Sequence, residues 1–162
     1  MSHDALDCKL AIPAVVKAGA AGSPTGSPAN PLAIPLKFTL QNRGKVSLRV
    51  LNWNTPLEGF FGNYLLVTGP DGPVPYEGPM VKRGAPERDE YVVIAPGQKV
   101  EADVDLALPY RIVKPGRYKV SYVGSLFDVT TAAIPRKLEQ FSAMKLHCEA
   151  MEFELQTSPP RR

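Results

Sequence analysis

The residue types that most often carry catalysis are few in this sequence, and their spacing does not favour chemistry. The only histidines are His3, near the N-terminus, and His147, which adjoins Cys148. Neighbouring side chains of a strand point to opposite faces, so His147 and Cys148 should not form a nucleophile and base pair. The same geometry argues against a metal site built on these residues. We expect His147 to be a surface or edge residue.

Two groups of carboxylates are the remaining candidates for chemistry. The acids within residues 87–90 lie in a polar loop, where water should leave their pKa values unshifted and unsuited to acid–base work. Glu101, Asp103 and Asp105 alternate along a strand, and residues two apart are separated by roughly 7 Å, too far to share one ion unaided. The sequence also lacks a glycine-rich phosphate loop, a Gly-x-Ser-x-Gly elbow and a His-Glu-x-x-His motif. We therefore expect no enzyme activity, no metal and no cofactor.

The strongest candidate for function is a binding loop between residues 76 and 91. Lys82 and Arg83 sit in a turn framed by proline and glycine, with two tyrosines and a methionine nearby. Aromatic and arginine side chains carry much of the energy of protein interfaces, and a stiff loop loses less entropy on docking. The alternative is that Lys82 and Arg83 only solubilise the turn or balance the acids of residues 87–90. The predicted contact residues are Tyr76, Met80, Lys82, Arg83 and Tyr91.

The stretch that should position this loop runs from Val46 to Val93. Its first part, Val46–Val50, alternates apolar and polar residues as a half-buried strand does, and Trp53 should plug one end of a sheet-on-sheet core. In the turn that follows, Pro56 fixes φ and Gly59 is free to take positive φ. Trp53, Pro56 and Gly59 are therefore predicted to be structural.

The other segments also predict short strands. Leu36–Leu40 alternates clearly and should form a hairpin with Val46–Val50 through the turn Asn42–Lys45. Pro13 should confine the first strand to an edge or make it switch sheets. Tyr118 begins a late strand and is a candidate tyrosine corner, a structural role. Further strands are expected at Cys8–Val16, Phe60–Val67, Val100–Leu106 and His147–Leu155. Lys114–Val123 should be a turn followed by a strand, and a short helix is expected within Ile134–Leu146.

Composition agrees with this pattern. The 162 residues suit one domain, and 17 prolines with 13 glycines disfavour long helices. We predict an all-β, immunoglobulin-like antiparallel sandwich of about seven to nine strands, with one short helix near the C-terminus. Residues 1–162 should form a single domain, with a mobile loop at about 18–31 and a frayed tail at about 156–162.

Charge and cysteine content restrict the partners and leave the compartment open. The net charge of +3 is too small and dispersed for a nucleic-acid surface, and no apolar run is long enough to cross a bilayer. No signal peptide is recognisable, so the chain is expected to be cytosolic unless a leader has been removed. Cys8 and Cys148 could form a disulfide or remain two buried thiols.

Several stretches of the chain carry a family resemblance. The runs LNWNTPLEG, VPYEGPMVKR, DEYVVIAPGQKVEADVDL and YRIVKPGRYKVSY, within Leu36–Gly124, resemble the N-terminal, non-catalytic region of the deuterolysin and peptidyl-Lys metalloendopeptidases, the aspzincin family. The zinc-binding motif of that family's catalytic domain is missing from this sequence. The resemblance implies a module like a protease pro-domain, without the protease.

The function that this resemblance implies is binding without catalysis. Such a module would inhibit a zinc endopeptidase of the aspzincin type by occluding its cleft, or would assist its folding. The alternative is a structural or adhesion-type sandwich that interacts with some other protein and has no protease partner.

Overall fold

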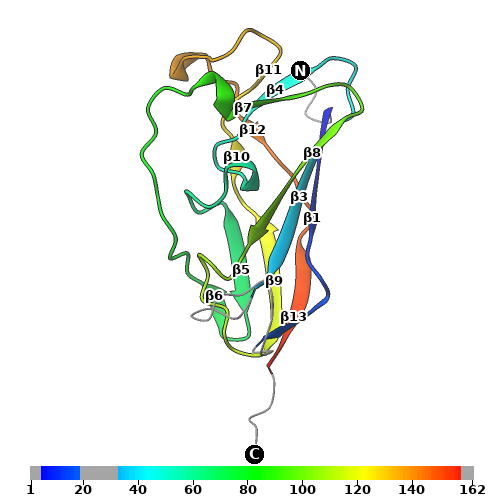
Figure 1. Ribbon diagram of the computed structural model, residues 1–162, viewed down its shortest axis with the longest axis vertical. Helices are drawn as coiled ribbons and strands as arrows, with labels where there is room; N and C mark the ends of the chain where they lie inside the picture. Colours follow the sequence, from blue (N-terminus) through cyan, green and yellow to red (C-terminus); the bar gives the residue numbers. More distant parts are fainter. Residues whose placement is uncertain (1–4, 19–32, 158–162) are drawn as a thin grey trace, which may run out of the picture.

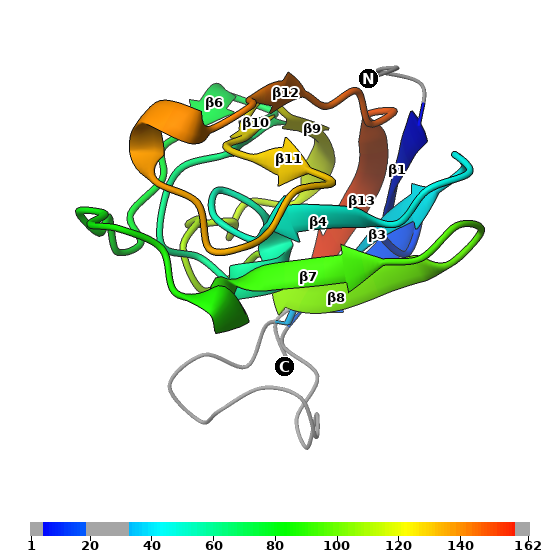
Figure 2. The same ribbon diagram turned by 90° about the horizontal axis from the view of Figure 1, so that it is seen from above.

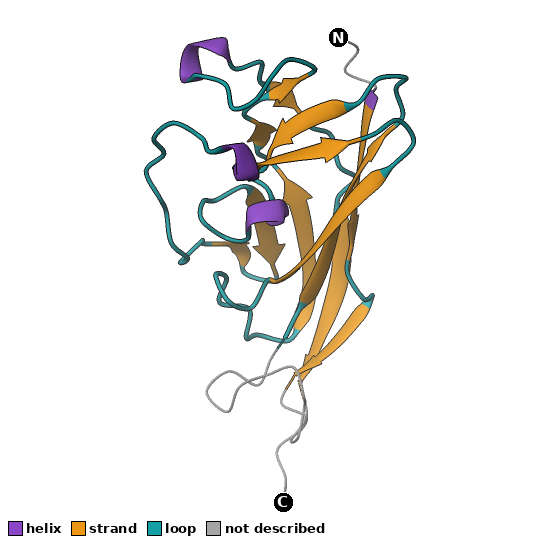
Figure 3. Ribbon diagram, turned by 45° about the horizontal axis from the view of Figure 1, so that its top comes forward, coloured by secondary structure: helices purple, strands orange, loops and turns teal. Residues whose placement is uncertain are grey.

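The computed structural model describes residues 5–18 and 33–157 and shows an all-β fold (Figure 1). Short strands account for nearly all of its regular structure, and the helical parts are single 3-10 turns (Figure 3). The predicted fold class is confirmed. The thirteen strands of the described residues exceed the predicted seven to nine, because several are only two to four residues long. No helix in the described part of the chain has the length and apolar character needed to cross a bilayer.

Two larger sheets enclose the main core. One has the order β1-β3-β8 and the other the order β2-β13-β9-β5-β6. All of their pairings are antiparallel except that of β2 with β13. Their strands are β1 (Leu6–Ala11), β3 (Pro35–Asn42) and β8 (Lys99–Asp105), then β2 (Val15–Ala18), β13 (Met151–Thr157), β9 (Gly116–Tyr122), β5 (Leu65–Gly69) and β6 (Gly72–Val74).

The apolar residues of both sheets meet in one cluster. Leu36, Phe38 and Leu40 of β3 face this cluster, as do Val120 of β9 and Phe153 of β13, and all five are fully buried. Because alternate residues of a strand point to opposite faces, the period-two pattern of β3 is sufficient to bury one face against the opposite sheet. The sandwich core therefore follows from the alternation that the sequence shows.

Two smaller sheets extend the sandwich at one end (Figure 2). The order of one is β11-β4-β7, and the other is the pair β10-β12. Their strands are β11 (Val129–Thr130), β4 (Leu48–Leu51), β7 (Tyr91–Ile94), β10 (Ser125–Leu126) and β12 (Met144–Lys145).

The predicted hairpin between Leu36–Leu40 and Val46–Val50 is wrong. β3 pairs with β8, and β4 pairs with β7, so the chain continues in one direction and bends between the two strands. The buried side chain of Asn42 holds the bend: its amide donates to the carbonyls of Val46 and Ile94, both at 2.8 Å, and its oxygen accepts from the N–H of Gly44. Val46 is exposed and lies outside β4.

Other predicted elements are placed as follows. At Pro13 the chain leaves the β1 sheet and enters the β2 sheet, one of the two predicted outcomes. The predicted helix at Ile134–Leu146 is reduced to the 3-10 turn η4 (Leu138–Gln140). The predicted strand Phe60–Val67 starts only at Leu65. The last strand extends to Thr157, so Gln156 and Thr157 do not belong to a frayed tail. The predicted loop lies almost wholly, and the rest of the tail entirely, outside the described residues.

One disulfide and one tyrosine hydroxyl contribute further fixed contacts within the sandwich. A disulfide joins Cys8 of β1 to Cys148, which precedes β13. The Tyr118 hydroxyl donates to the carbonyl of Lys114 at 2.6 Å, the contact that a tyrosine corner makes. Tyr118 is buried and its ring stacks on Phe153, so its role is structural.

Candidate functional site

The turn after β4 positions a carboxylate beside the candidate loop. Thr55 caps the 3-10 helix η2 (Pro56–Glu58) by accepting from the N–H of Leu57, and Pro56 occupies its first turn. Gly59 ends the helix at φ 91°, a conformation that strains other residues. Glu58, at the end of η2, therefore lies in a fixed place, with one carboxylate oxygen accepting from the N–H of Asn54 at 2.7 Å.

The long connection from β6 to β7 crosses one side of the molecule as an extended loop (Figure 1). Arg83 attaches this loop to the body. It donates to both carboxylate oxygens of Glu58, 2.6 Å from Oε1, and its guanidinium lies over the Trp53 ring at 4.9 Å from the centroid. The side chains of this ion pair are only 22% and 7% exposed. Because paired and stacked guanidinium groups are held strongly, Arg83 is a tether rather than a free contact residue.

Trp53 lies in a second, smaller apolar cluster beneath Arg83. Its neighbours there are Leu51 and Tyr91, with Ile134 and Phe141 packed against them. The indole is buried, and its N–H donates to Glu90 Oε2 at 2.7 Å. The prediction that Trp53 plugs the sheet-on-sheet core needs correction, because this cluster is separate from the core between the two larger sheets. Trp53 instead supports the end of the candidate loop.

Glu90 has a structural environment rather than a catalytic one. It ends the 3-10 turn η3 (Arg88–Glu90), where its carboxylate accepts from the N–H of Glu87 and from Trp53. Burial alone would raise the pKa of Glu90, but these two hydrogen bonds and the charge of Arg83 hold it below its ordinary value. A carboxylate with a lowered pKa stays ionised at neutral pH and is a poor general acid.

Tyr91 is not available to a partner. It is 6% exposed, and its hydroxyl donates to Asp128 Oδ2 at 2.8 Å. Asp128 is fully buried and also accepts from Arg136 and from the N–H of Ser142. Burial and the neighbouring carboxylate raise the pKa of Tyr91 to about 12. The predicted contact residue Tyr91 therefore belongs to an internal network that joins β7 to the segment around η4.

Two further attachments hold the beginning of the loop. The Tyr76 hydroxyl donates to the carbonyl of Pro79 at 2.6 Å, and its ring packs edge-on against Tyr110 at 5.5 Å. The N–H of Val81 donates to the carbonyl of Phe61 at 3.1 Å. Tyr76 is half-buried, so it shapes the loop from within.

What the loop presents to solvent is a short strip, Met80–Lys82. Met80 is 71% exposed, Val81 is 44% exposed, and Lys82 is exposed. Of the five predicted contact residues, only Met80 and Lys82 point away from the body. The contact strip, defined here as Met80, Val81 and Lys82, is therefore smaller than the sequence predicted and includes a valine that sequence reasoning missed.

Several of the groups that could have done chemistry already have structural partners. Cys148 is bonded to Cys8, so its thiol is not available to His147. Asp105 accepts from the backbone N–H groups of Ile34 and Ala107, and Glu101 lies 3.7 Å from Lys99. Within the described residues, no three His, Cys, Asp or Glu side chains are grouped to hold a metal.

Sequence reasoning also missed the residues that hold the loop. Glu58 was not assigned a role, Glu90 was considered only as one of the acids of residues 87–90, and the network of Asp128 with Arg136 was not foreseen. The Thr-Pro-Leu-Glu turn was the one signal available, because it fixes where Glu58 must lie. The pairing of Glu58 with Arg83, 25 residues later, leaves no local pattern.

Comparison with known proteins gives one partial match in sequence. No family model matches this chain. Over 91 residues, which are 56% of the chain, it is 31% identical to an extracellular protease of Aeromonas hydrophila, and the match covers 26% of that protein. Part of this chain is therefore similar in sequence to part of an extracellular protease. The chain spans about a quarter of the length of that relative.

Solved structures add little. Two structures of a beta-glucosidase from Listeria innocua, one of them with gluconolactone, match with TM-scores of 0.37 and 0.31. They share 14% and 13% identity and cover 94% and 93% of this chain but 16% of each glucosidase chain. TM-scores this low carry no argument about fold or function.

Proposed function

We propose that this chain is a non-catalytic module that binds a secreted endopeptidase and occludes its cleft, as an inhibitor or as a folding aid. The observation that carries the proposal is the 31% identity with part of an extracellular protease. The resemblance to the non-catalytic region of aspzincin proteases refines it to a zinc endopeptidase. The 162 residues contain no His-Glu-x-x-His motif, which agrees with a module that lacks the protease's own chemistry.

The contact strip Met80–Lys82 is the surface that we assign to this binding. A protease cleft accepts an extended backbone, and this strip is extended, solvent-exposed and held on both sides by Tyr76 and Arg83. A segment held in this way loses less conformational entropy on docking than a flexible loop would. The tethers thus support binding without touching the partner.

The proposal can be tested with two purified proteases, a peptidyl-Lys metalloendopeptidase and the extracellular protease of Aeromonas hydrophila. The chain should slow cleavage of a fluorogenic peptide or raise the yield of active protease on refolding from denaturant. Replacing Met80 and Lys82 together by Ala should weaken the effect by about 2 kcal/mol, the level of an interface hot spot. Lys9→Ala, an exposed lysine on β1, is the matched control and should have no effect.

The outcome that contradicts the proposal is also defined. If the folded chain neither binds nor inhibits either protease and does not change its refolding, the module has another partner. If inhibition occurs but survives the loss of Met80 and Lys82, the protease is the partner and the contact strip is not the site.

A further inference from the structure

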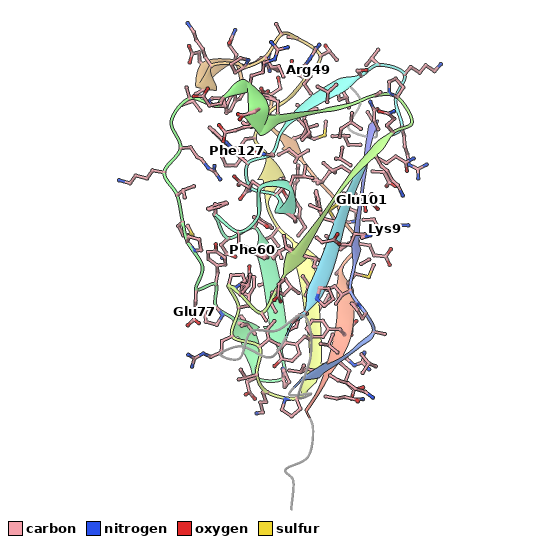
Figure 4. All side chains as sticks on the ribbon, in the orientation of Figure 1. Lys9, Arg49, Phe60, Glu77, Glu101 and Phe127 are labelled. Carbon is pink, nitrogen blue, oxygen red and sulfur yellow. A yellow bond between two sulfur atoms is a disulfide. The ribbon has the colours of Figure 1, made fainter. Side chains whose placement is uncertain are left out.

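A groove lies beside the C-terminal end of β8, next to the contact strip but lined by none of its three residues. Its volume is about 440 Å³, and its walls come from the turn after η2, the start of the long loop, the end of β8 and the turn that follows β8. Phe60, which lines it, lies on the side of β8 that faces away from β3 (Figure 4).

Most of the groove wall is apolar. Phe61 is 42% exposed and Leu108 is 73% exposed, and Pro79 and Pro109 also line the groove. Phe60 is fixed because its ring stacks on the buried Tyr64, with centroids 5.5 Å apart and planes 8° apart. Large apolar side chains exposed together at a rigid groove are typical of a binding surface.

Two carboxylates border the groove on the β8 side. Oδ1 of Asp105 accepts from the N–H groups of Ile34 at 2.8 Å and Ala107 at 2.9 Å, which fixes the carboxylate and leaves Oδ2 without a partner among the described residues. Asp103 is exposed and forms no ion pair within the described residues, although Lys37 lies opposite it on β3. A cation reaching the groove would therefore meet acceptors that are already in position.

The backbone of β8 has outward-facing groups on this side at Asp103, whereas the carbonyl of Asp105 already accepts from the N–H of Leu108 at 3.2 Å. β8 is the last strand of its sheet, and β3 is its only partner in that sheet. Leu106 N–H donates to the carbonyl of Ile34, so by the alternation of an antiparallel ladder the N–H and C=O of Asp103 point away from β3. Unpaired groups on an edge strand are a template for another strand. The groove thus has an apolar wall, two acids and a free strand edge.

We propose that the groove binds an extended peptide segment of another protein in which basic and apolar side chains alternate. The segment adds to the free edge of β8 as an antiparallel strand. Its basic side chains then lie opposite Asp103 and Asp105, because directly opposed residues of paired strands share a face. The apolar side chains between them contact Phe61 and Leu108.

The test uses a fluorescein-labelled heptapeptide that alternates Lys and Val, with fluorescence anisotropy as the readout. The alternating peptide should bind the full chain at least tenfold more tightly than one with Glu in place of Lys. It should also bind more tightly than a block peptide of the same composition, KKKKVVV. Equal affinity for the alternating and block peptides would show attraction by charge alone and would overturn the proposal.

Variants of the chain then locate the site. Leu108→Ser removes the exposed apolar wall, and Asp103→Asn removes a charge while keeping the backbone N–H, so each should weaken binding at least fivefold. Leu66→Ser, at an exposed leucine of β5 outside the groove, is the matched control and should leave peptide binding unchanged. Unchanged affinity in both groove variants would exclude this groove.

Backbone pairing has a readout of its own. An added strand uses only alternate N–H groups, so methylating the amide nitrogens of the Lys residues should abolish binding, while methylating those of the Val residues should not. Equal effects of the two methylated peptides would overturn strand addition. Because no protease is present in these experiments, their failure leaves the proposed function standing, and the reverse also holds.

Discussion

Lys82 and Arg83 are adjacent in sequence and have different roles in the structure. Lys82 points into solvent, whereas Arg83 is paired with Glu58 and stacked on Trp53. The sequence presented them as one basic pair. Neighbouring residues of an extended chain point in opposite directions. When one of the two side chains faces solvent, the other therefore faces the body of the protein.

The first prediction separates these two residues by stability. Arg83→Ala should lower the free energy of unfolding by about 2 kcal/mol, because it leaves the mostly buried carboxylate of Glu58 without its partner. Lys82→Ala should change it by less than about 0.5 kcal/mol, as is usual for exposed residues. Urea denaturation measures both. Adding Glu58→Gln to Arg83→Ala should restore part of the loss, and equal effects of the two single variants would contradict the assignment.

The second prediction concerns the buried acid Asp128. Burial would raise its pKa, but hydrogen bonds from Arg136, from the N–H of Ser142 and from Tyr91 hold the pKa below its ordinary value. A lowered folded-state pKa stabilises the protein above the unfolded value of about 3.9, and this contribution is lost as the pH falls through the folded value.

Asp128→Asn should therefore be strongly destabilising at pH 7, by about 3–5 kcal/mol, because Arg136 is left without its partner. The difference from wild type should start to shrink as the pH falls below about 4, where Asp128 of the unfolded chain takes up a proton, and should vanish once the pH is below the lowered folded-state pKa. Thermal unfolding followed across pH 2–7 measures this convergence. A difference that stays constant with pH would show that the charge of Asp128 is not what matters.

At the scale of elements, the sequence predicted the positions of individual strands well, because these depend on local patterns. The alternation of Leu36–Leu40 and Val100–Leu106 identified β3 and β8, and Pro13 marked the change of sheet. The pairing of strands was harder to predict. Asn42–Lys45 has the composition of a hairpin turn. In the structure, however, a hydrogen bond from Asn42 to Ile94, 52 residues away, holds this segment as a bend between β3 and β4.

The candidate site shows the same division. Exposure of Met80 and Lys82 followed from the loop composition, but the inward positions of Arg83 and Tyr91 depend on Glu58, Trp53 and Asp128, which are distant in sequence. Long-range partners leave no periodic signal in a single sequence. The prediction of a short helix at 134–146 was wrong for a related reason. Hydrogen bonds from Arg136 and Ser142 to Asp128 fix this segment, and only one 3-10 turn forms within it.

The third prediction tests the bend between β3 and β4. Asn42→Ala removes three buried or half-buried hydrogen bonds, so it should destabilise the protein by about 2–3 kcal/mol. Hydrogen exchange should accelerate most in β4 and β7, which meet at this bend. The control is Gln41→Ala, which replaces the neighbouring amide side chain, because Gln41 is less buried than Asn42. Uniform acceleration across all strands would argue against a local role.

At the scale of the whole molecule, the disulfide closes almost the entire chain. Cys8 and Cys148 are 140 residues apart, and in the chain-entropy account a loop above 100 residues contributes roughly 5 kcal/mol. The fourth prediction is that replacing both cysteines by Ser lowers stability by up to about this amount while the β-type far-UV spectrum is retained. Thermal unfolding with and without reductant measures it, and an identical melting temperature in both conditions would contradict it.

The same closure determines what a single proteolytic cut can do. The contact strip and the long loop lie between the two bonded cysteines, so cleavage at Lys82 would leave both halves of the chain covalently joined. The half that carries Arg83 would also keep its ion pair with Glu58 on the other half. Such a clipped molecule should run as one band on a non-reducing gel and as two bands after reduction. If the proposed protease partner cut the chain at Lys82, the two halves would therefore stay together and folded around the same disulfide.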